Sequence, residues 1–555
     1  MTRTGAQLLV ECLLEQDVEM GFGVPGESYL AVLDALHDVT NRFRFIGCRN
    51  EGGGAFMAEA YGKLTGKPGI LFVTRGPGAT NASIGIHTAM QNSTPMVIFV
   101  GQIETSMRDR EAFQELDYRA VFGTMAKWVV EIDDADRVPE LVSRAFSTAL
   151  SGRPGPVVVA LPEDMLIQET EALPRGRITP VKAEASAQSL VQVMEMISQA
   201  ERPVVIAGGG SWNDEGTAAL TRFAEINELP VVVSFRGQDV INNYSPSYIG
   251  EAAFSLPPEV RAFLADSDLI IALNVRFGET LTAGYTLFDP ATFQTKLVHI
   301  HASDDEIGKI FTPDLGIVSD PNAALAGLAA LAADKPITNP VWGERTKAAR
   351  AIWEEGLNVR PQPGDVDMGE IMKYLAKRVP EDAIITNGAG NFAVWGGRFL
   401  HYGAGRRLLG PQAGAMGAGI PAAVAAKLAQ PHRFVLCFAG DGDFQMTGNE
   451  LGTALQYGAA PVILVLNNGT YGTIRMHQER EFPGRVSGTD IINPDFAMFA
   501  QAYGLHGETV RQTDEFEAAF ERACASKTGG LIELVIDPEG ISPKTTISEL
   551  RARNS

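Results

Sequence analysis

Two apolar runs joined by a glycine- and aspartate-rich turn, between residues 434 and 472, constrain the fold of this chain most strongly. FVLCFA (434–439) and PVILVLN (461–467) read as buried strands, and QMTGNELGTALQYG between them has apolar residues at helical spacing. The pattern predicts one βαβ unit. Polar residues follow both strands, at the sheet edge where open α/β proteins bind ligands.

The residues at these two strand ends suit a metal ion and a diphosphate group. Asp441 offers an anionic oxygen and Asn468, 27 positions later (468 − 441), a neutral one, which is a combination that suits Mg²⁺. Glycines allow close approach to a phosphate, and a helix beginning near the end of GDGDF favours anions. The residues expected to face the diphosphate here are Gly440, Gly442, Asp443 and Phe444. Either half alone is commonly a cap or a turn, but the pair predicts a joint site.

Length and strand–helix alternation predict an α/β protein of three doubly wound, mostly parallel-sheet domains within the 555 residues. The predicted ranges are a first unit over 1–170, a linker over 171–187, a central Rossmann-like unit over 188–335, a second linker over 336–365, a third unit over 366–545 and a tail over 546–555. The first and third units have a similar layout.

Composition and charge exclude several classes of partner. The formal net charge of −21 argues against nucleic acid or an anionic membrane. No apolar run reaches the roughly 18 residues of a membrane helix, and acidic residues interrupt the N-terminal apolar pattern, so we expect neither a span nor a signal peptide. The four cysteines form no CxxC motif, which is typical of a reducing compartment. A cytoplasmic protein is expected.

The motifs, taken in chain order, resemble the acetolactate synthase branch of the thiamine diphosphate enzymes. They are FGVPGE (22–27), RNEGGGAFMAEAYGKLTGKPGI (49–70), TRGPGATN (74–81), REAFQE (110–115), GAMGAGIPAA (414–423), GDGDF and LNNGTYG. The resemblance covers nearly the whole chain. It implies thiamine diphosphate and Mg²⁺ as cofactors and leaves FAD possible in the central unit. It also implies a homodimer or homotetramer in which the first unit of one chain contacts the pyrimidine of a cofactor whose diphosphate lies on the partner's third unit.

Thiamine diphosphate chemistry needs a carboxyl group hydrogen-bonded to the pyrimidine, so that the cofactor's own amino group can remove a proton. Glu51, which follows the strand-like FRFIGC and precedes three glycines, is the candidate. Alone it would read as a helix N-terminal carboxylate, but the resemblance implies the catalytic role.

The resemblance also implies roles for further residues, each at a position that matches a motif of the family. Catalytic roles are implied for Glu51, Gln114 and His477. Further cofactor contacts are implied at Pro25, Gly26, Asn81, Asn391 and Met416, and metal ligands at Asp441, Asn468 and the carbonyl of Thr470. The substrate side is implied to comprise Phe113, Gln114, Lys127, Thr473, Ile474 and His477.

Three stretches depart from the acetolactate synthase pattern. The family's arginine for the carboxylate of a second 2-keto acid is replaced by Thr280 in RFGETLTA (276–283), which removes a charged contact worth about 1.5–3 kcal/mol. A pocket tryptophan is replaced by His477, a group that could relay a proton. In the FAD-binding region, Gly208-Gly209-Gly210 and Arg276 are kept, but GEAAFSLPP (250–258) replaces a family stretch.

These observations predict an enzyme that makes or breaks C–C bonds next to a carbonyl. It would decarboxylate a 2-keto acid, join the resulting enamine to an aldehyde or ketone, or do both. The alternatives are a true acetolactate synthase, which makes 2-acetolactate and CO₂ from two pyruvates, and a relative of the aldehyde lyase, benzoylformate decarboxylase or acyl-CoA type. A dinucleotide-dependent oxidoreductase and a catalytically silent homologue are weaker alternatives, because the full dinucleotide fingerprint is missing and Glu51, Asp441 and Asn468 are present.

Overall fold

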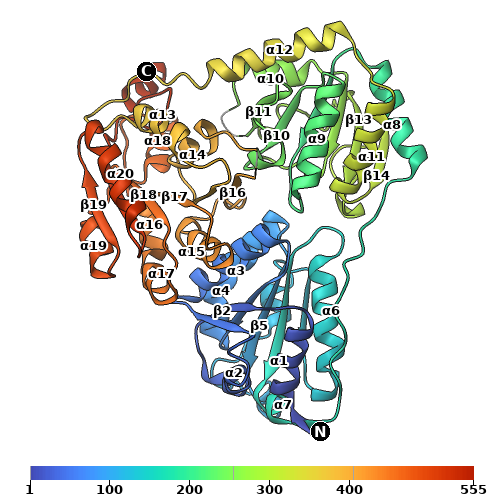
Figure 1. The fold of residues 1–555 in the computed structure, drawn as a ribbon, viewed down its shortest axis with the longest axis vertical. Helices are drawn as coiled ribbons and strands as arrows, with labels where there is room; N and C mark the ends of the chain where they lie inside the picture. Colours follow the sequence, from blue (N-terminus) through green and yellow to red (C-terminus); the bar gives the residue numbers. More distant parts are fainter. Residues whose placement is uncertain (1, 254–255, 404, 555) are drawn as a thin grey trace.

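The computed structural model describes residues 2–253, 256–403 and 405–554 and contains three α/β domains (Figure 1). Each domain is built on a six-stranded sheet whose neighbouring strands are all parallel. The central strands are almost completely buried, as expected for parallel sheets covered by helices on both faces. The predicted fold class is confirmed.

The first domain, blue to cyan in Figure 1, has the strand order β3-β2-β4-β5-β7-β6. Its strands are β2 (Met20–Gly23), β3 (Arg44–Gly47), β4 (Gly69–Val73), β5 (Met96–Gln102), β6 (Trp128–Glu131) and β7 (Pro156–Pro162). Its helices are α1 (Gly5–Glu15), α2 (Leu30–His37), α3 (Glu51–Thr65), α4 (Gly76–Asn92), α5 (Tyr118–Phe122), α6 (Val138–Leu150) and α7 (Glu163–Ile167). A short antiparallel pair of β1 (Arg3–Thr4) and β8 (Glu169–Thr170) joins the two ends of this domain.

The third domain repeats this topology, because its order β16-β15-β17-β18-β20-β19 places the strands in the same succession. Its strands are β15 (Ile384–Asn387), β16 (Arg407–Leu409), β17 (Val435–Gly440), β18 (Val462–Asn467), β19 (His506–Val510) and β20 (Gly530–Val535). Its helices are α13 (Met368–Arg378), α14 (Ala393–Phe399), α15 (Gly419–Ala429), α16 (Asp441–Thr447), α17 (Leu451–Tyr457), α18 (Gly472–Glu481), α19 (Phe496–Ala502), α20 (Phe516–Ala525) and α21 (Ile547–Asn554). The similar layout predicted for the two units is therefore an equivalence of strand order.

The central domain has the order β11-β10-β9-β12-β13-β14, which is the Rossmann succession 3-2-1-4-5-6. Its strands are β9 (Pro203–Ala207), β10 (Val231–Ser234), β11 (Tyr248–Ala252), β12 (Leu269–Leu273), β13 (Lys296–His301) and β14 (Leu315–Val318). Its helices are α8 (Ala187–Gln199), α9 (Asp214–Ile226), α10 (Pro258–Ala265) and α11 (Pro321–Asp334), and α12 (Pro340–Glu355) leads to the third domain.

The first and third domains share one apolar cluster. Ala55 and Ala58 of α3 belong to it together with Ala422 and Ala426 of α15, and all four side chains are buried. Small residues on both helices let their backbones approach closely. The two domains of one chain are thus joined by a common core.

Several local expectations are corrected by the structure. The helix expected to begin near Asp443 begins at Asp441, and it is interrupted at Gly448–Glu450 by a 3₁₀ turn before α17. The tail predicted over 546–555 contains helix α21, and the sequence analysis recognised no strand at β6, β11, β14, β16 or β19. All five of those strands lie at sheet edges.

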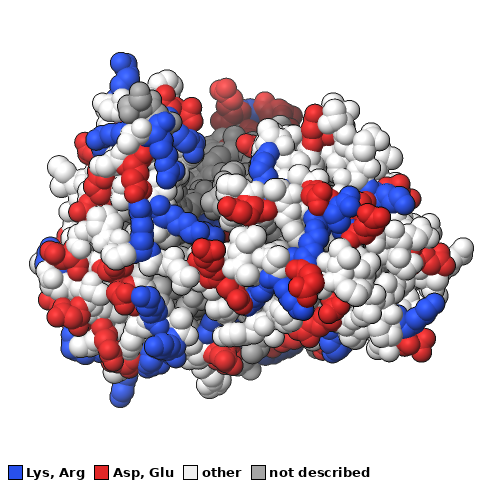
Figure 2. Space-filling model, turned by 90° about the horizontal axis from the view of Figure 1, so that it is seen from above, with Lys and Arg blue, Asp and Glu red and all other residues white. Residues whose placement is uncertain are grey.

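The described surface carries charged side chains of both signs (Figure 2). Figure 2 shows Lys and Arg interspersed with Asp and Glu over the face seen from above. Within the part of the chain that the structure describes, no helix combines the length and the apolar character needed to cross a membrane.

Candidate active site

A cavity of about 240 Å³ opens at the carboxyl ends of β15, β17 and β18 in the third domain. Its lining includes ten residues predicted from the sequence: Asn391, Met416, Gly440, Asp441, Gly442, Asp443, Asn468, Thr470, Thr473 and Ile474. These residues come together because β17 and β18 are parallel neighbours, with Gly440 paired to Leu466, so that both polar strand ends meet at one edge.

The expected metal ligands lie in this cavity. Asp441 is 3% exposed, and its carboxylate accepts hydrogen bonds from the amides of Gly442 (2.9 Å) and Gly469 (3.0 Å). Burial raises the pKa of Asp441, so a nearby cation would stabilise its charged form. The Asn468 side-chain oxygen accepts a hydrogen bond from the Thr470 amide at 3.3 Å. One carboxylate, one amide oxygen and one backbone carbonyl form a donor set that suits Mg²⁺.

Asn493 is a functional candidate that the sequence analysis missed. Its Nδ2 donates to Asp441 Oδ2 at 2.8 Å and to Asn467 Oδ1 at 2.8 Å, and its own oxygen accepts a hydrogen bond from Gln445 Nε2 at 2.9 Å. It therefore orients the carboxylate that is predicted to bind the metal, from 52 positions away in sequence. Its only sequence cue is a polar residue before Pro494, which is typical of an ordinary turn.

Close packing around the two glycines of the GDG motif leaves no room for side chains. A Cβ at Gly442 would lie 2.6 Å from the Tyr471 ring, and one at Gly440 would lie 2.7 Å from the Phe392 ring. The backbone is thereby left open to a ligand in the cavity.

Asp443 is 2% exposed and contributes an oxygen without a hydrogen-bond partner among the described residues. Its Oδ1 accepts from the amides of Gly417 (2.9 Å) and Ala389 (3.0 Å), whereas Oδ2 has none. Burial raises the pKa of this carboxyl group to about 7. A buried oxygen of this kind calls for a bound group that donates a hydrogen bond or carries a positive charge. The oxygens of Asp441 and Asn468 therefore fit a metal ion, and the open backbone of Gly440 and Gly442 fits a diphosphate.

Two predicted third-domain residues lie outside the cavity lining. The buried Phe444 ring packs edge-on against Phe496 at 5.2 Å between ring centroids. His477 is exposed on α18, where its Nδ1 accepts a hydrogen bond from Arg480 at 2.6 Å. Their assigned roles stay predictions.

The C-terminal helix α21 braces the wall of the cavity. Arg551 donates two hydrogen bonds, at 2.8 and 2.6 Å, to Glu479 on α18, whose side chain is fully buried. Helix α18 also carries Thr473 and Ile474 of the lining. Arg475 and the Gly484 amide complete the set of donors to Glu479.

The first-domain residues form a second cluster at the carboxyl edge of their own sheet. Glu51 is the first residue of α3, which is capped by the Asn50 side chain, and Glu51 Oε2 accepts a hydrogen bond from Asn81 Nδ2 at 2.9 Å. Gly26, after the exposed Pro25, packs against Thr74, where an added Cβ would lie 2.5 Å from the Thr74 Cβ. Glu51 and Asn81 are thus brought together, and neither is among the residues that line the third-domain cavity of the same chain.

The loop expected on the substrate side contains Phe113 and Gln114. The Phe113 side chain is 70% exposed, with the Arg75 guanidinium 5.9 Å from its ring centroid. Gln114 has a left-handed backbone (φ 66°), and its carbonyl accepts a hydrogen bond from Gly76 N at the start of α4. The loop therefore lies beside the start of α4, the helix that carries Asn81.

Lys127 has a structural position. Its ammonium donates hydrogen bonds of 2.6 Å to the carbonyls of Thr148 and Ser151, at the C-terminus of α6. A cation there satisfies unpaired carbonyl groups and complements the helix dipole.

At the carboxyl edge of the central sheet, protein atoms surround the glycine turn after β9. A Cβ at Gly210 would lie 2.8 Å from the carbonyl oxygen of Ser93 in the first domain. Arg276 donates to Gln91 of α4 at 3.2 Å. This edge packs against the first domain. Thr280 is half-buried in the turn that follows β12, while part of the 250–258 stretch lies outside the described residues.

The fold and the two clusters are those of an α/β protein with a polar cavity in one domain, which fits a metal ion and a diphosphate, and a helix-leading glutamate in another. Comparison with known proteins gives three successive matches to thiamine pyrophosphate (thiamine diphosphate) enzymes. The N-terminal TPP binding domain matches residues 3–121, the central domain 190–328 and the C-terminal TPP binding domain 388–534.

Curated relatives match along nearly the full length. The acetolactate synthase isozyme 2 large subunit of Escherichia coli (strain K12) is 30% identical over 96% of this chain and 95% of its own. The acetolactate synthase large subunit of Lactococcus lactis subsp. lactis (strain IL1403) is 34% identical over 90% of this chain and 87% of its own. The probable acetolactate synthase large subunit of Methanocaldococcus jannaschii is 30% identical over 97% and 93%.

The chain belongs to the acetolactate synthase family of thiamine diphosphate-dependent enzymes. It is an acetolactate-synthase-like enzyme of the carboligase and decarboxylase type.

Proposed function

We propose that this enzyme uses Mg²⁺ and thiamine diphosphate to decarboxylate a 2-keto acid and join the remaining acyl carbon to an acceptor, and that it works as at least a homodimer. The observation that carries the proposal is the presence of two incomplete half-sites on one chain. Third-domain residues line the cavity with Asp441 and Asn468, whereas Glu51 is bonded to Asn81 in the first domain. A complete site forms when the cavity of one chain faces Glu51 of another.

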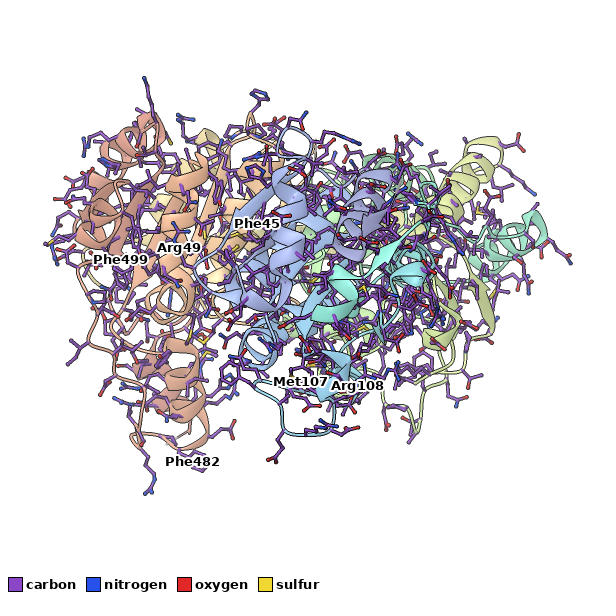
Figure 3. The ribbon with its side chains drawn as sticks, turned by 90° about the horizontal axis from the view of Figure 1, so that it is seen from below. Phe45, Arg49, Met107, Arg108, Phe482 and Phe499 are labelled. Carbon is purple, nitrogen blue, oxygen red and sulfur yellow. The ribbon has the colours of Figure 1, made fainter. Side chains whose placement is uncertain are left out.

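Exposed apolar side chains on the first and third domains support association of two copies. They are Leu30, Ile84, Met107 and Phe113 in the first domain, and Ile474, Phe482 and Ile492 in the third. In Figure 3 Met107 and Phe482 lie at the same edge of the molecule. Large apolar side chains exposed on a protein surface are typical of an interface between subunits.

Several residues of the two half-sites have a defined role in this proposal. Bound thiamine diphosphate would supply a carbon nucleophile and an electron sink for the electron pair that remains when CO₂ leaves. Asp441, Asn468 and the Thr470 carbonyl would hold Mg²⁺. Glu51 would hold the proton shared with the pyrimidine nitrogen, and the apolar walls made by Met416, Phe392, Trp395 and Ile474 would exclude water.

The proposed acceptor is an aldehyde or ketone without a carboxylate, because Thr280 cannot supply a bidentate charged contact. The names of the relatives support a second candidate, the synthesis of 2-acetolactate from two pyruvates. Incubation with pyruvate alone and with pyruvate plus an aldehyde, followed by mass analysis, separates the two. Under the first proposal Thr280→Arg raises the share of 2-acetolactate. An unchanged product ratio contradicts the role given to Thr280.

Mixing two inactive variants tests the shared site. Glu51→Gln and Asp441→Asn homodimers should each lose more than about 100-fold in kcat, since each lacks a group needed in both sites. In the mixed dimer one site receives Glu51 from the Asp441→Asn chain and Asp441 from the Glu51→Gln chain. We expect activity to reappear on co-expression with two tags. If the purified hybrid stays inactive while both variants fold and associate, the shared-site proposal fails.

The proposal also places the enzyme in the cytoplasm without a nucleic-acid partner. The formal net charge of −21 argues against a nucleic-acid partner, and four cysteines without a CxxC motif are typical of a reducing compartment. FAD is not included, because the glycine turn of the central domain is packed against Ser93.

A further inference from the structure

The turn that leads into Glu51 is docked on the third domain of the same chain. The Gly47 amide donates to the Tyr457 hydroxyl at 2.7 Å, and Arg49 donates to the Gly452 carbonyl at 3.0 Å and to Gln456 Oε1 at 2.7 Å. In Figure 3 Arg49 lies at the boundary between the ribbons of the two domains. Three contacts therefore fix residues 47–49 on helix α17.

Glu450 makes the contacts nearest to Glu51. Its carboxylate accepts hydrogen bonds from the backbone amides of Arg49 (3.1 Å) and Asn50 (3.0 Å), the two residues directly before Glu51. The Glu450 side chain is fully buried, and Thr453 Oγ1 donates to its second oxygen at 2.5 Å. A buried carboxylate with this many donors holds its backbone partners firmly.

The glycines after Glu51 make room for this contact. A Cβ at Gly53 would lie 2.3 Å from Glu450 Oε1 and 2.8 Å from its Cδ. The Glu450 carboxylate thus packs directly over the first turn of α3, the helix that Glu51 begins.

Glu450 is also close in sequence to the metal ligand of its own domain. Asp441 begins α16, and the 3₁₀ turn that follows this helix ends at Glu450. One ten-residue segment, 441–450, therefore carries a ligand for one half-site at its start and the support of the other half-site at its end.

We propose that Glu450 is a positioning residue for Glu51 of its own chain. It controls the active site that this Glu51 serves and leaves unaffected the site whose diphosphate its own domain binds. The inference rests on the proposed function, in which these are two different sites of one dimer. Glu450 touches neither the cofactor nor the substrate, and it acts through the backbone of Arg49 and Asn50.

Two hybrid dimers distinguish control of Glu51 from control of the cofactor half-site. The first pairs a Glu450→Ala chain with a Glu51→Gln chain, so the only Glu51 lies on the chain that lacks Glu450. The second pairs a chain that carries both Glu51→Gln and Glu450→Ala with a wild-type chain. The only Glu51 then lies on the wild-type chain, where Glu450 supports it, while its cofactor lies on the chain that lacks Glu450. The reference pairs Glu51→Gln with wild type and should have half the activity of the wild-type dimer.

The two hybrids should differ in kcat. We expect the first to fall by about 10- to 100-fold below the reference, since small displacements of a reacting group have effects of this size, with KM changing less than threefold. The second should match the reference. Any of three outcomes overturns the proposal: a loss of kcat in the second hybrid alone, equal losses in both hybrids, or no loss in either.

Conservative and non-kinetic measurements cover the case in which Ala disturbs folding or the dimer proposal fails. Glu450→Gln keeps one oxygen for both backbone amides, so its homodimer should retain kcat within about threefold. In cofactor-free protein, amide hydrogen exchange at Arg49 and Asn50 should quicken about tenfold in Glu450→Ala and stay unchanged in Glu521→Ala, a variant of an exposed ion pair on α20. Unchanged exchange at those two amides overturns the positioning role whether or not the reference hybrid is active. A reference hybrid without half the wild-type activity counts against the shared site alone.

Discussion

Replacement of Arg551 by Met should release the C-terminal helix from the wall of the cofactor cavity. The two hydrogen bonds between Arg551 and Glu479 measure 2.8 and 2.6 Å, and each charged hydrogen bond contributes about 1.5–3 kcal/mol when shielded from water. The Arg551 side chain is 41% exposed, so water replaces part of this contact. Methionine keeps most of the apolar stem. We therefore expect α21 to open more easily by about 2 kcal/mol, or about 30-fold in the opening equilibrium.

Amide hydrogen exchange measures this opening directly. Exchange in residues 547–553 should quicken about 30-fold in Arg551→Met, with a smaller increase in α18, because Glu479 keeps Arg475 and the Gly484 amide. Arg553→Met removes an exposed cation from the same helix and serves as the control. Equal exchange of α21 in the wild type and in Arg551→Met would refute the conclusion that the Arg551–Glu479 pair holds α21 on α18.

The stabilisation that the Arg551–Glu479 pair provides should also depend on pH. The hydrogen bonds from Arg551 lower the pKa of Glu479 from 4.5 to about 2. A carboxyl group whose pKa is depressed in the folded state stabilises that state above the unfolded pKa, and the stabilisation is lost as pH falls through the folded pKa. The difference in melting temperature between the wild type and Arg551→Met should therefore be full above about pH 5 and shrink toward about pH 2. A constant difference over this range contradicts the ionic nature of the pair.

Three further changes test other parts of the site. Asn493→Ala frees one side of the Asp441 carboxylate and should weaken Mg²⁺ binding about 10-fold in calorimetry without unfolding the protein; unchanged affinity would deny Asn493 an orienting role. Lys127→Met removes two contacts from the end of α6 and should lower the free energy of unfolding by about 2 kcal/mol, while kcat/KM changes less than twofold; a large loss of kcat/KM at normal stability would return Lys127 to the substrate side. The purified protein should show no flavin absorbance. Release of FAD when the purified protein is denatured would contradict the inference drawn from the packing of the glycine turn at Gly210.

The local sequence determined the central strands and predicted most of the residues that line the third-domain cavity. Strands such as β17 and β18 are buried on both faces and appear as continuous apolar runs, which makes them visible without any partner. Once the two strands are parallel neighbours, the residues after them must meet. For that reason Asp441 and Asn468 could be placed in one site from their spacing alone.

Only the tertiary structure decided the edges and supports of these sheets. Five of the strands that were not predicted, β6, β11, β14, β16 and β19, lie at the edges of the six-stranded sheets, where one side has no neighbouring strand and the apolar signal is short. The role of Lys127 depends on the end of α6, that of Glu479 on α21, and that of Glu450 on backbone amides some 400 positions away. A short segment of sequence records what a residue can bond, whereas the folded chain decides which distant group it meets. The motifs therefore identified the chemistry, and the packing of the first domain on the third assigned the residues that hold Glu51 in place.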